Sequence, residues 1–334
     1  MIMPEHKRNS APLRPGLAVI IQGCSWLKNE TYMCVVFLWK TPSAMLPLTI
    51  LLVAFASGTT GPIKQTEKKK KTWVLSWEDH FEGSSLNESI WNVRNNMSHC
   101  CGPFGGAGEL QLYLPDEITV KDGKLHIRTR RRDATGSDKK PYHFTSGWID
   151  TKGKWSQKFG RFEANVSLPS HKVEGIWPAF WLMPNNASQC WPTGGEVDRV
   201  VTLSVRMKVE VDIFEFLGNG IEDKIYGSFH WAEPGACGKD KAPIPGKGYR
   251  PHNAAKDWQR DFHIYAIEWW EDRIDFFLDG VKYFTRSSSN VLLPTSEMYV
   301  IFDQAVDSWL FPPSDKTDYG DGVFMTVEWV RVYT

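Results

Sequence analysis

The chain has 334 residues with 39 basic and 39 acidic side chains, so its formal net charge is zero. A neutral chain without a basic stripe is a poor match for nucleic acid, and we expect no nucleic-acid partner. The unusual feature of the composition is its aromatic content, with 16 Trp, 10 Tyr and 18 Phe. Aromatic rings suit both an all-β core and the C–H faces of sugars, and composition alone does not separate these uses.

A short apolar run from Leu48 to Ala56 is followed by the small residues Ser57 and Gly58. A bilayer span needs about 20 residues, so this run resembles the core of a secretory signal peptide instead. We interpret residues 1–58 as an N-terminal extension with a signal-peptide-like segment and expect a secreted protein without a stable membrane span. Translation is expected to begin at Met45; the alternative is a signal anchor retained in the mature protein.

Two features after residue 58 agree with secretion. Glycosylation sequons begin at Asn87, Asn96, Asn165 and Asn186. The cysteines are Cys100, Cys101, Cys190 and Cys237. An even number of cysteines in an oxidising compartment allows up to two disulfides, with their pairing left open. No C-x-x-C or H-x-x-x-H pair predicts a zinc site.

The pattern of apolar and polar residues changes after a lysine-rich stretch. Residues 59–71 end in Lys68 to Lys71 and predict a solvated linker. Beyond it, short alternating segments predict strands at 124–130, 160–168 and 273–278. Asp279-Gly280 predicts a hairpin between the last of these and 281–284. Many short strands without a long amphipathic helix predict an all-β sandwich, which forms one domain over residues 72–334.

Three acids lie within the apolar segment Val209 to Phe216. On a regular strand Glu210 and Asp212 share a face, and a β-bulge before Glu215 would bring the third acid to that face. Like charges so close are costly, but a retaining glycosidase needs an ionised nucleophile and a protonated acid about 5–5.5 Å apart. We predict Glu210 as nucleophile, Glu215 as general acid and base, and Asp212 as the residue that tunes Glu210. The alternative is an acidic edge that faces solvent or binds a cation, and no metal ligands are assigned.

Several blocks of the chain resemble glycoside hydrolase family 16, in its laminarinase-like (endo-β-1,3-glucanase) branch. They occur in family order at Trp77 to Gly83, Glu109 to Tyr113, Ile149 to Gly153, Phe159 to Glu163, Gly175 to Pro184, Glu210 to Glu215 and Val327 to Tyr333. The resemblance implies a concanavalin-like β-jelly roll with a concave substrate cleft.

The resemblance also implies substrate-binding residues. Carried over by position, they are Trp177, Trp181, Arg161, His230 and Glu109. Each has a structural alternative: core packing for the tryptophans, and above all for Trp181; an exposed strand end for Arg161; a supporting hydrogen bond for His230; and an outer, solvent-facing strand for Glu109.

The chain departs from the family pattern at the catalytic strand. The motif begins as Gly-Gly-Glu-Val-Asp, with Glu196 as its acid, and is then interrupted by Arg199 to Val209. Glu196 is therefore an alternative nucleophile, but Glu210 keeps the spacing to Glu215 and is preferred. The insertion either forms an extra ribbon beside the site or prevents folding.

Smaller departures affect the surroundings of the acids. Trp148 stands where the family often has Arg, and the segment with Asp303 and Gln304 lacks the usual Asn and Gly-Gly, which makes their place in the cleft uncertain. A structural calcium ion is also implied, although Glu328 replaces an Asp of the closing strand.

The resulting prediction is a retaining endo-hydrolase of β-1,3-glucan of the laminarin type, monomeric and needing no cofactor for its chemistry. The alternatives are a non-catalytic β-glucan recognition protein on the same fold, and a transglycosylase that passes the same intermediate to a sugar. Retention of all three acids favours the enzyme.

Overall fold

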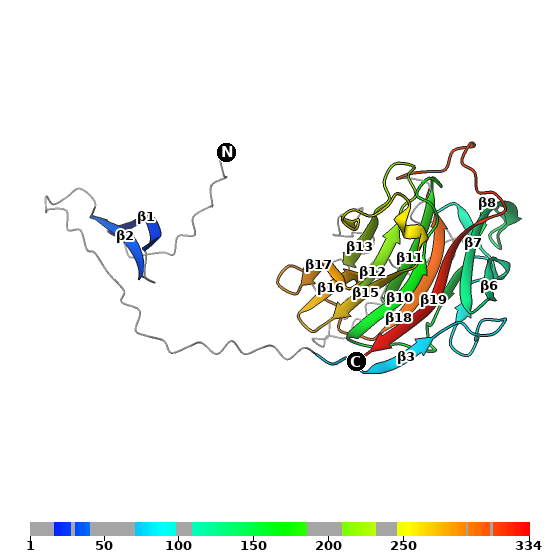
Figure 1. The fold of residues 1–334 in the computed structure, drawn as a ribbon, viewed down its shortest axis with the longest axis horizontal. Coiled ribbons are helices and arrows are strands. Elements are labelled where there is room, and N and C mark those ends of the chain that lie inside the picture. The colour runs from blue at the N-terminus through cyan, green and yellow to red at the C-terminus, as the bar shows by residue number, and fades with distance from the viewer. Residues whose placement is uncertain are drawn as a thin grey trace. The chain divides into compact units, whose positions relative to one another are not determined.

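The computed structural model describes residues 17–27, 31–40, 71–97, 109–185, 209–231, 246–291, 293–307 and 310–334. The chain divides into two compact units, Met1–Lys71 and Thr72–Thr334. In the first unit, β1 (Leu17–Leu27) and β2 (Thr31–Lys40) form an antiparallel pair (Figure 1). The sequence predicts only an extension over residues 1–58, and this strand pair is an addition to that prediction.

Two sheets build the described part of the second unit (Figure 1). The larger sheet has the order β17-β16-β15-β10-β19-β7-β8-β5, with β3 on β19 and β6 on β7. Its strands are β17 (Val281–Ser287), β16 (Arg273–Leu278), β15 (His263–Trp269), β10 (Gly160–Ser167), β19 (Val323–Tyr333), β7 (Lys124–Thr135), β8 (Pro141–Ser146), β5 (Gln111–Tyr113), β3 (Leu75–Asp79) and β6 (Ile118–Lys121).

The smaller sheet has the order β14-β13-β12-β11-β18-β9-β4. Its strands are β14 (Lys247–Tyr249), β13 (Ile225–Trp231), β12 (Val209–Phe216), β11 (Ile176–Pro184), β18 (Met298–Val306), β9 (Trp148–Asp150) and β4 (Asn92–Val93). Two short 3₁₀ turns, η1 (Pro115–Glu117) and η2 (Trp258–Arg260), complete the described elements. The predicted all-β sandwich is confirmed.

The main core lies between the two sheets because each strand presents alternate side chains inward. Phe180 of β11 stacks on Phe302 of β18 with ring centroids 4.5 Å apart, and both are fully buried. Phe162 of β10 contributes from the larger sheet to the same cluster. Burial of each such ring contributes about 1.5–3 kcal/mol. The opposite face of β11, β12 and β18 is consequently free to carry polar groups.

The predicted hairpin at Asp279-Gly280 is also confirmed. It joins β16 to β17, and the φ angles of Asp279 and Gly280 are 48° and 75°. Both residues are thus left-handed, as a two-residue turn of this type requires, and Asp and Gly tolerate that conformation best. The predicted strands at 124–130, 160–168 and 273–278 correspond to β7, β10 and β16.

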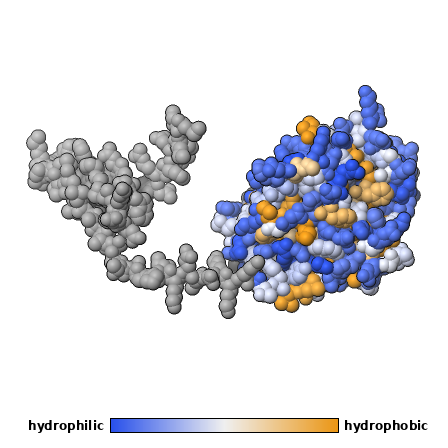
Figure 2. All heavy atoms as spheres, viewed as in Figure 1, coloured by the Kyte–Doolittle hydropathy of each residue, from blue (hydrophilic) through white to orange (hydrophobic). Residues whose placement is uncertain are grey.

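The surface of the second unit is largely polar. Figure 2 shows hydrophilic residues over most of its visible face, with apolar residues in separate small patches. Among the described residues, the exposed large hydrophobic side chains are Val74, Leu75, Ile221, Phe262, Val281 and Phe324. Scattered apolar residues of this kind are normal on a folded domain.

Candidate active site

The three acids of β12 lie on the outward face of the smaller sheet, which we call the acid face. Glu210 pairs with His230 and Asp212 with Ser228, but the register then shifts and Glu215 pairs with Tyr226. The predicted bulge between Asp212 and Glu215 is therefore confirmed. The extra residue lets both Ile213 and Phe214 enter the core while Glu215 returns to the face of Glu210.

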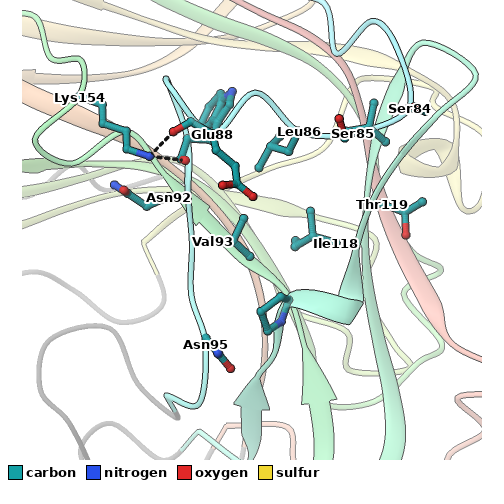
Figure 3. Close-up of a pocket in the computed structure, with 13 residues that line it drawn as sticks. Ser84, Ser85, Leu86, Glu88, Asn92, Val93, Asn95, Ile118, Thr119 and Lys154 are labelled. Atoms are coloured by element: carbon teal, nitrogen blue, oxygen red, sulfur yellow. Dashed lines mark hydrogen bonds between the residues drawn. The ribbon is translucent and has the colours of Figure 1, made fainter.

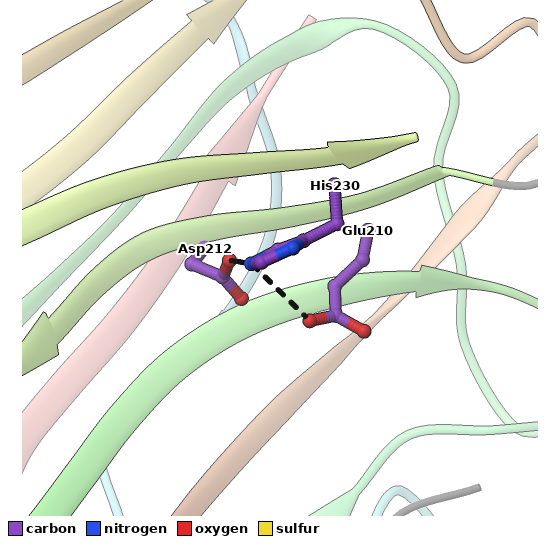
Figure 4. Close-up of side chains that lie close together, drawn as sticks. All are labelled: Glu210, Asp212 and His230. Atoms are coloured by element: carbon purple, nitrogen blue, oxygen red, sulfur yellow. Dashed lines mark ion pairs between the residues drawn. The ribbon is translucent and has the colours of Figure 1, made fainter. Parts of the chain in front are cut away.

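A histidine of the neighbouring strand lies against two of the acids. Nε2 of His230 is 3.1 Å from Oδ2 of Asp212 and 4.0 Å from Oε1 of Glu210 (Figure 4). Exposure of these residues is 8% for Glu210, 3% for Asp212 and 7% for His230. A protonated imidazole at this position offsets the repulsion between two poorly solvated carboxylates.

Glu215 has a different environment from the other two acids. The indole Nε1 of Trp177 donates to its Oε1 at 3.1 Å, and the Ser228 hydroxyl donates to its Oε2 at 2.6 Å. Burial and then the charge of Asp212 raise the pKa of Glu215 to about 7, against the opposing effects of His230, Ser228 and Trp177. Near neutral pH this carboxyl can therefore carry a proton and give it up, as a general acid and base must.

The acid face also holds one group of three side chains, among the described residues, that could bind a metal ion. Glu210, Asp212 and His230 each present one ligand atom, and these atoms lie within 4.8 Å of one another. We assign no metal to this group of side chains. At the predicted calcium position, the Glu328 carboxylate accepts a hydrogen bond from Asn165 at 2.6 Å and lies 3.7 Å from Nζ of Lys124. A calcium ion stays a prediction.

Aromatic side chains form a second layer beside the acids, separate from the main core. Trp148 of β9 packs edge-on against Trp181 of β11 and Tyr113 of β5, at 5.3 Å and 5.4 Å between ring centroids. All three are buried. Trp148, which replaces the Arg of the family pattern, thus contributes packing to this layer. Together with Ala179, Met183, Tyr299 and Ile301 these rings form one apolar cluster, which we call the aromatic floor.

Asp303 of β18 lies within the aromatic floor. Its Oδ1 accepts a hydrogen bond from Trp181 Nε1 at 2.7 Å, and its Oδ2 lies 2.7 Å from the Tyr113 hydroxyl. Burial, together with the charges of Glu109 and Asp212, raises the pKa of Asp303 to about 8. Gln304 points the other way, into the sandwich, where its Nε2 donates to Thr129 Oγ1 at 2.7 Å. The sequence does not decide whether either residue lies in the cleft. Because side chains alternate along β18, Asp303 lies on the acid face and Gln304 in the core.

The remaining predicted site residues fall in different places. Glu109 lies near Asp303: its Oε2 is 3.4 Å from the Tyr113 hydroxyl and accepts from Gln111 Nε2 at 2.7 Å. Trp177 is partly exposed beside Glu215, whereas Trp181 is buried within the aromatic floor.

The predicted substrate ligand Arg161 does not lie with the acids of β12, and its binding of substrate stays a prediction. Arg161 lies on β10 in the larger sheet, where its Nε and Nη1 donate to Glu163 at 2.8 Å and Glu268 at 3.1 Å. The next residue, Phe162, points inward and is part of the main core. Arg161 therefore points outward from the larger sheet, on the opposite side of the sandwich from the acid face. Arg161 lies near the start of its strand, as the alternative states, but its side chain is only 16% exposed.

The sequence analysis does not name Ser228 as a site residue, although its position on the strand predicts it. It lies two residues before His230 on β13, so period-2 alternation puts both side chains on the face of the acids. Several other predictions lie outside the described residues. These are the alternative nucleophile Glu196, the insertion up to residue 208, the sequon at Asn186, and the four cysteines Cys100, Cys101, Cys190 and Cys237.

A pocket of roughly 580 Å³ lies away from the acids, between the segment 84–95 and the η1–β6 region (Figure 3). Lys154 borders it, and its ammonium donates to the carbonyl oxygens of Glu88 and, at 2.7 Å, Trp91. Backbone carbonyls thus engage the cation at this pocket. The acids of β12 do not line it, so we do not consider it the catalytic site.

The domain is similar to known glucanases in sequence and in structure. A glucan endo-1,3-beta-glucosidase of Cryptopygus antarcticus is 30% identical over 310 residues, which cover 86% of this chain and 97% of that protein. The catalytic domain of an endo-1,3-beta-glucanase (laminarinase) from Thermotoga petrophila RKU-1 superposes with a TM-score of 0.66 at 28% identity, covering 79% of this chain and 99% of that one.

A third relative is much longer than this chain. The clotting factor G alpha subunit of Tachypleus tridentatus is 26% identical over 78% of this chain, and the match spans 34% of that protein. The sequence profile of Glycosyl hydrolases family 16 matches residues 111–331, which include β12 and the floor strands. The two-sheet sandwich is thus the jelly roll of these relatives, and the chain belongs to glycosyl hydrolases family 16.

Proposed function

We propose that the chain is a retaining endo-β-1,3-glucanase that cleaves laminarin-type glucan. The observation that carries this proposal is the bulged strand β12, which places Glu210 and Glu215 on one face in contrasting environments. Glu210 lies near a histidine, while Glu215 has its pKa raised to about 7. Environments that separate the proton affinities of two carboxyls assign one as nucleophile and the other as acid.

In the first step, the Glu210 carboxylate attacks the anomeric carbon and the glycosidic C–O bond breaks. Glu215 gives its proton to the departing oxygen, so the leaving sugar is released as a neutral alcohol. In the second step, Glu215 takes a proton from water, whose oxygen attacks the anomeric carbon and releases Glu210. The product keeps its anomeric configuration, and Glu215 regains its proton for the next cycle.

Asp212 and His230 support these steps by electrostatics. The contact of 3.1 Å between them places the His230 imidazole beside Asp212 and 4.0 Å from Glu210, where it would stabilise both carboxylates when protonated. The negative charge of Asp212 raises the pKa of Glu215, which favours its acid form. Removal of Asp212 should therefore affect both halves of the reaction.

Trp177 is the best candidate for stacking on a sugar ring. It is partly exposed, and its indole N–H is held by Glu215, so its face is fixed beside the acid. Trp181 is buried within the aromatic floor and is a weaker candidate for stacking. We propose that neither cofactor nor catalytic metal takes part, because two carboxylates supply nucleophile, acid and base.

The names of the relatives support β-1,3-glucan as the substrate, since both the Cryptopygus and the Thermotoga proteins are described as endo-1,3-beta-glucanases or glucosidases. The test is release of reducing sugar from laminarin by the full chain beside Glu210→Gln. Glu268→Gln, which changes an acid of the larger sheet, is the matched control. We expect activity in the wild type and control and a loss of about 10⁴-fold or more in Glu210→Gln.

The stereochemistry of the first product distinguishes the mechanism. We expect proton NMR to show the β-anomer before mutarotation, and intact-mass measurement with a slow activated glycoside to show one glycosyl group attached to the chain. A first product of inverted configuration would exclude Glu210 as nucleophile. Folded protein that binds laminarin without cleaving it would instead support a recognition protein, and transfer to added sugar acceptors would support a transglycosylase.

We also propose that the protein is secreted and acts as a monomer. Support for secretion comes from the apolar segment 48–56 and from the sequon at Asn87, whose side chain is exposed in the structure. No helix within the described residues is both long and apolar enough to cross a membrane. N-terminal sequencing of protein from culture medium, with light scattering for its mass, tests both proposals.

A further inference from the structure

Three side chains near the catalytic acids form a chain of hydrogen-bond contacts. Oδ2 of Asp303 lies 2.7 Å from the hydroxyl of Tyr113, and the same hydroxyl lies 3.4 Å from Oε2 of Glu109. A tyrosine hydroxyl carries a single proton, so it donates to one acceptor at a time. With both carboxyls ionised, two negative oxygens would compete for one hydrogen at a buried position.

A proton on Asp303 resolves this competition. Oδ2–H of Asp303 then donates to the Tyr113 oxygen, and the Tyr113 hydroxyl donates onward to Glu109. Oδ1 of Asp303 remains an acceptor for Trp181 Nε1 at 2.7 Å. Glu109 also accepts from Gln111 at 2.7 Å, which suits an ionised carboxylate at the end of the chain. Each of these contacts then has one donor and one acceptor.

The surroundings of Asp303 contain acids and neutral groups. From β12, Asp212 acts on it electrostatically, and from the segment before β5, Glu109 does so as well. On β9 the nearest acid is Asp150, whose Oδ2 already accepts from Arg94 Nε and Trp148 Nε1, each at 2.9 Å. Among the described residues, no Lys, Arg or His forms an ion pair with Asp303, which is 5% exposed.

We propose that Asp303 is a positioning residue that works in its protonated form, holding Trp181 and Tyr113 in the floor while keeping a further negative charge away from Asp212. The proposal rests on the glucanase function proposed above. Ionisation of Asp303 would reverse the hydrogen bond to Tyr113 and set a new charge near the acids. Burial and neighbouring acids raise the pKa of Asp303 to about 8, which agrees with a protonated group at neutral pH.

Asp303→Asn is the decisive variant because an amide reproduces the protonated carboxyl. Its oxygen can accept from Trp181 and its NH₂ can donate to Tyr113. We expect kcat/KM on laminarin within about threefold of the wild type near neutral pH. Above about pH 8 the wild type should lose activity with two protons, from Glu215 and Asp303, and the variant with one. A loss of more than about tenfold in folded Asp303→Asn, or identical pH profiles, would overturn the proposal.

Infrared difference spectroscopy reads the proton independently of catalysis. The spectrum of the full-length wild type minus that of Asp303→Asn at about pH 6 should contain a protonated-carboxyl stretch, which disappears on raising the pH. Asp275→Asn is the control, because Asp275 is equally buried but lies 3.0 Å from Arg273 Nε and should show no such band. Absence of the Asp303 band would refute the protonated form even if glucanase activity is present.

A second variant keeps the test available if Asp303→Asn does not fold. Tyr113→Phe removes the hydroxyl that accepts from Asp303, so the carboxyl stretch should move to higher frequency. An unchanged band would contradict the hydrogen-bond chain. Because this readout needs no turnover, failure of the proposed function would appear separately, in the Glu210→Gln experiment.

Discussion

Glu117 and Glu215 lie in the same sandwich, but their electrostatic surroundings are opposite. Glu117 is fully buried beside the larger sheet, and three arginines of β7 pair with it: Arg128 at 2.6 Å, Arg130 at 3.0 Å and Arg132 at 3.0 Å. Glu215 has an indole and a hydroxyl as partners and a neighbouring acid, and its pKa is raised to about 7.

The groups around a buried acid therefore distinguish a structural carboxylate from a catalytic one in this fold. Guanidinium groups around a buried carboxylate compensate its charge through ion pairs, which gives such an acid a structural role. A carboxyl that is hydrogen-bonded by neutral donors and repelled by a neighbouring acid can exchange a proton near neutral pH. The same reasoning places Arg161, between Glu163 and Glu268, with the structural pairs of the larger sheet.

The largest effect is expected from Glu215→Gln. Loss of the proton donor should lower kcat on laminarin by about 10²–10⁴-fold. Thermal stability should be unchanged or slightly higher, because the variant no longer places a charge beside Asp212. Activity assays and thermal unfolding of the same preparation check both statements. A fully active variant would remove Glu215 from the acid role.

Glu117→Gln should show the converse behaviour. Removing this charge leaves three arginines without their buried partner, at a cost of about 3 kcal/mol in the free energy of unfolding. The folded fraction should keep its kcat, because Glu117 does not contact the acid face. Denaturant unfolding measures the loss of stability, and activity per folded molecule measures whether kcat is kept. An activity loss without destabilisation would break the contrast between the two glutamates.

The pH dependence should report on Glu215. Since its folded pKa is raised to about 7, kcat/KM should fall as the pH rises through about 7. Stability should change in the same direction as activity. The contribution of Glu215 to the free energy of unfolding is present below its unfolded pKa and is lost as the pH rises through about 7. The Ser228 hydrogen bond favours the ionised form and lowers this pKa.

Ser228→Ala should consequently move the alkaline limb of activity upward by about one pH unit. The measurement is kcat/KM on laminarin between about pH 5 and pH 10. Ser167→Ala, on β10 of the larger sheet, is a matched control and should leave the profile unchanged. A downward shift in Ser228→Ala would mean that the hydroxyl stabilises the protonated form instead.

The smallest effect is expected from Arg161→Met. If the ion pairs to Glu163 and Glu268 are structural, KM for laminarin should stay within about twofold, and stability should fall by about 1 kcal/mol or less. Substrate titration and thermal unfolding are sufficient here. A tenfold rise in KM would restore Arg161 as a substrate ligand.

The sequence by itself determined the local features of this protein. Alternation of apolar residues determined strands such as β7, β10 and β16, and Asp279-Gly280 determined its hairpin, because these depend on neighbouring residues. The odd spacing between Glu210 and Glu215 even required the bulge, since a regular strand would have turned one acid into the core.

Tertiary structure decided which side chains meet. Arg161 and Trp177 each lie on a strand next to apolar neighbours, and nothing in their local sequence shows that they belong to different sheets. The contacts of Asp303 with Tyr113 and Trp181 join strands far apart in the sequence. The pKa of a carboxyl depends on such long-range neighbours and on burial, and the residues adjacent in sequence determine neither of them.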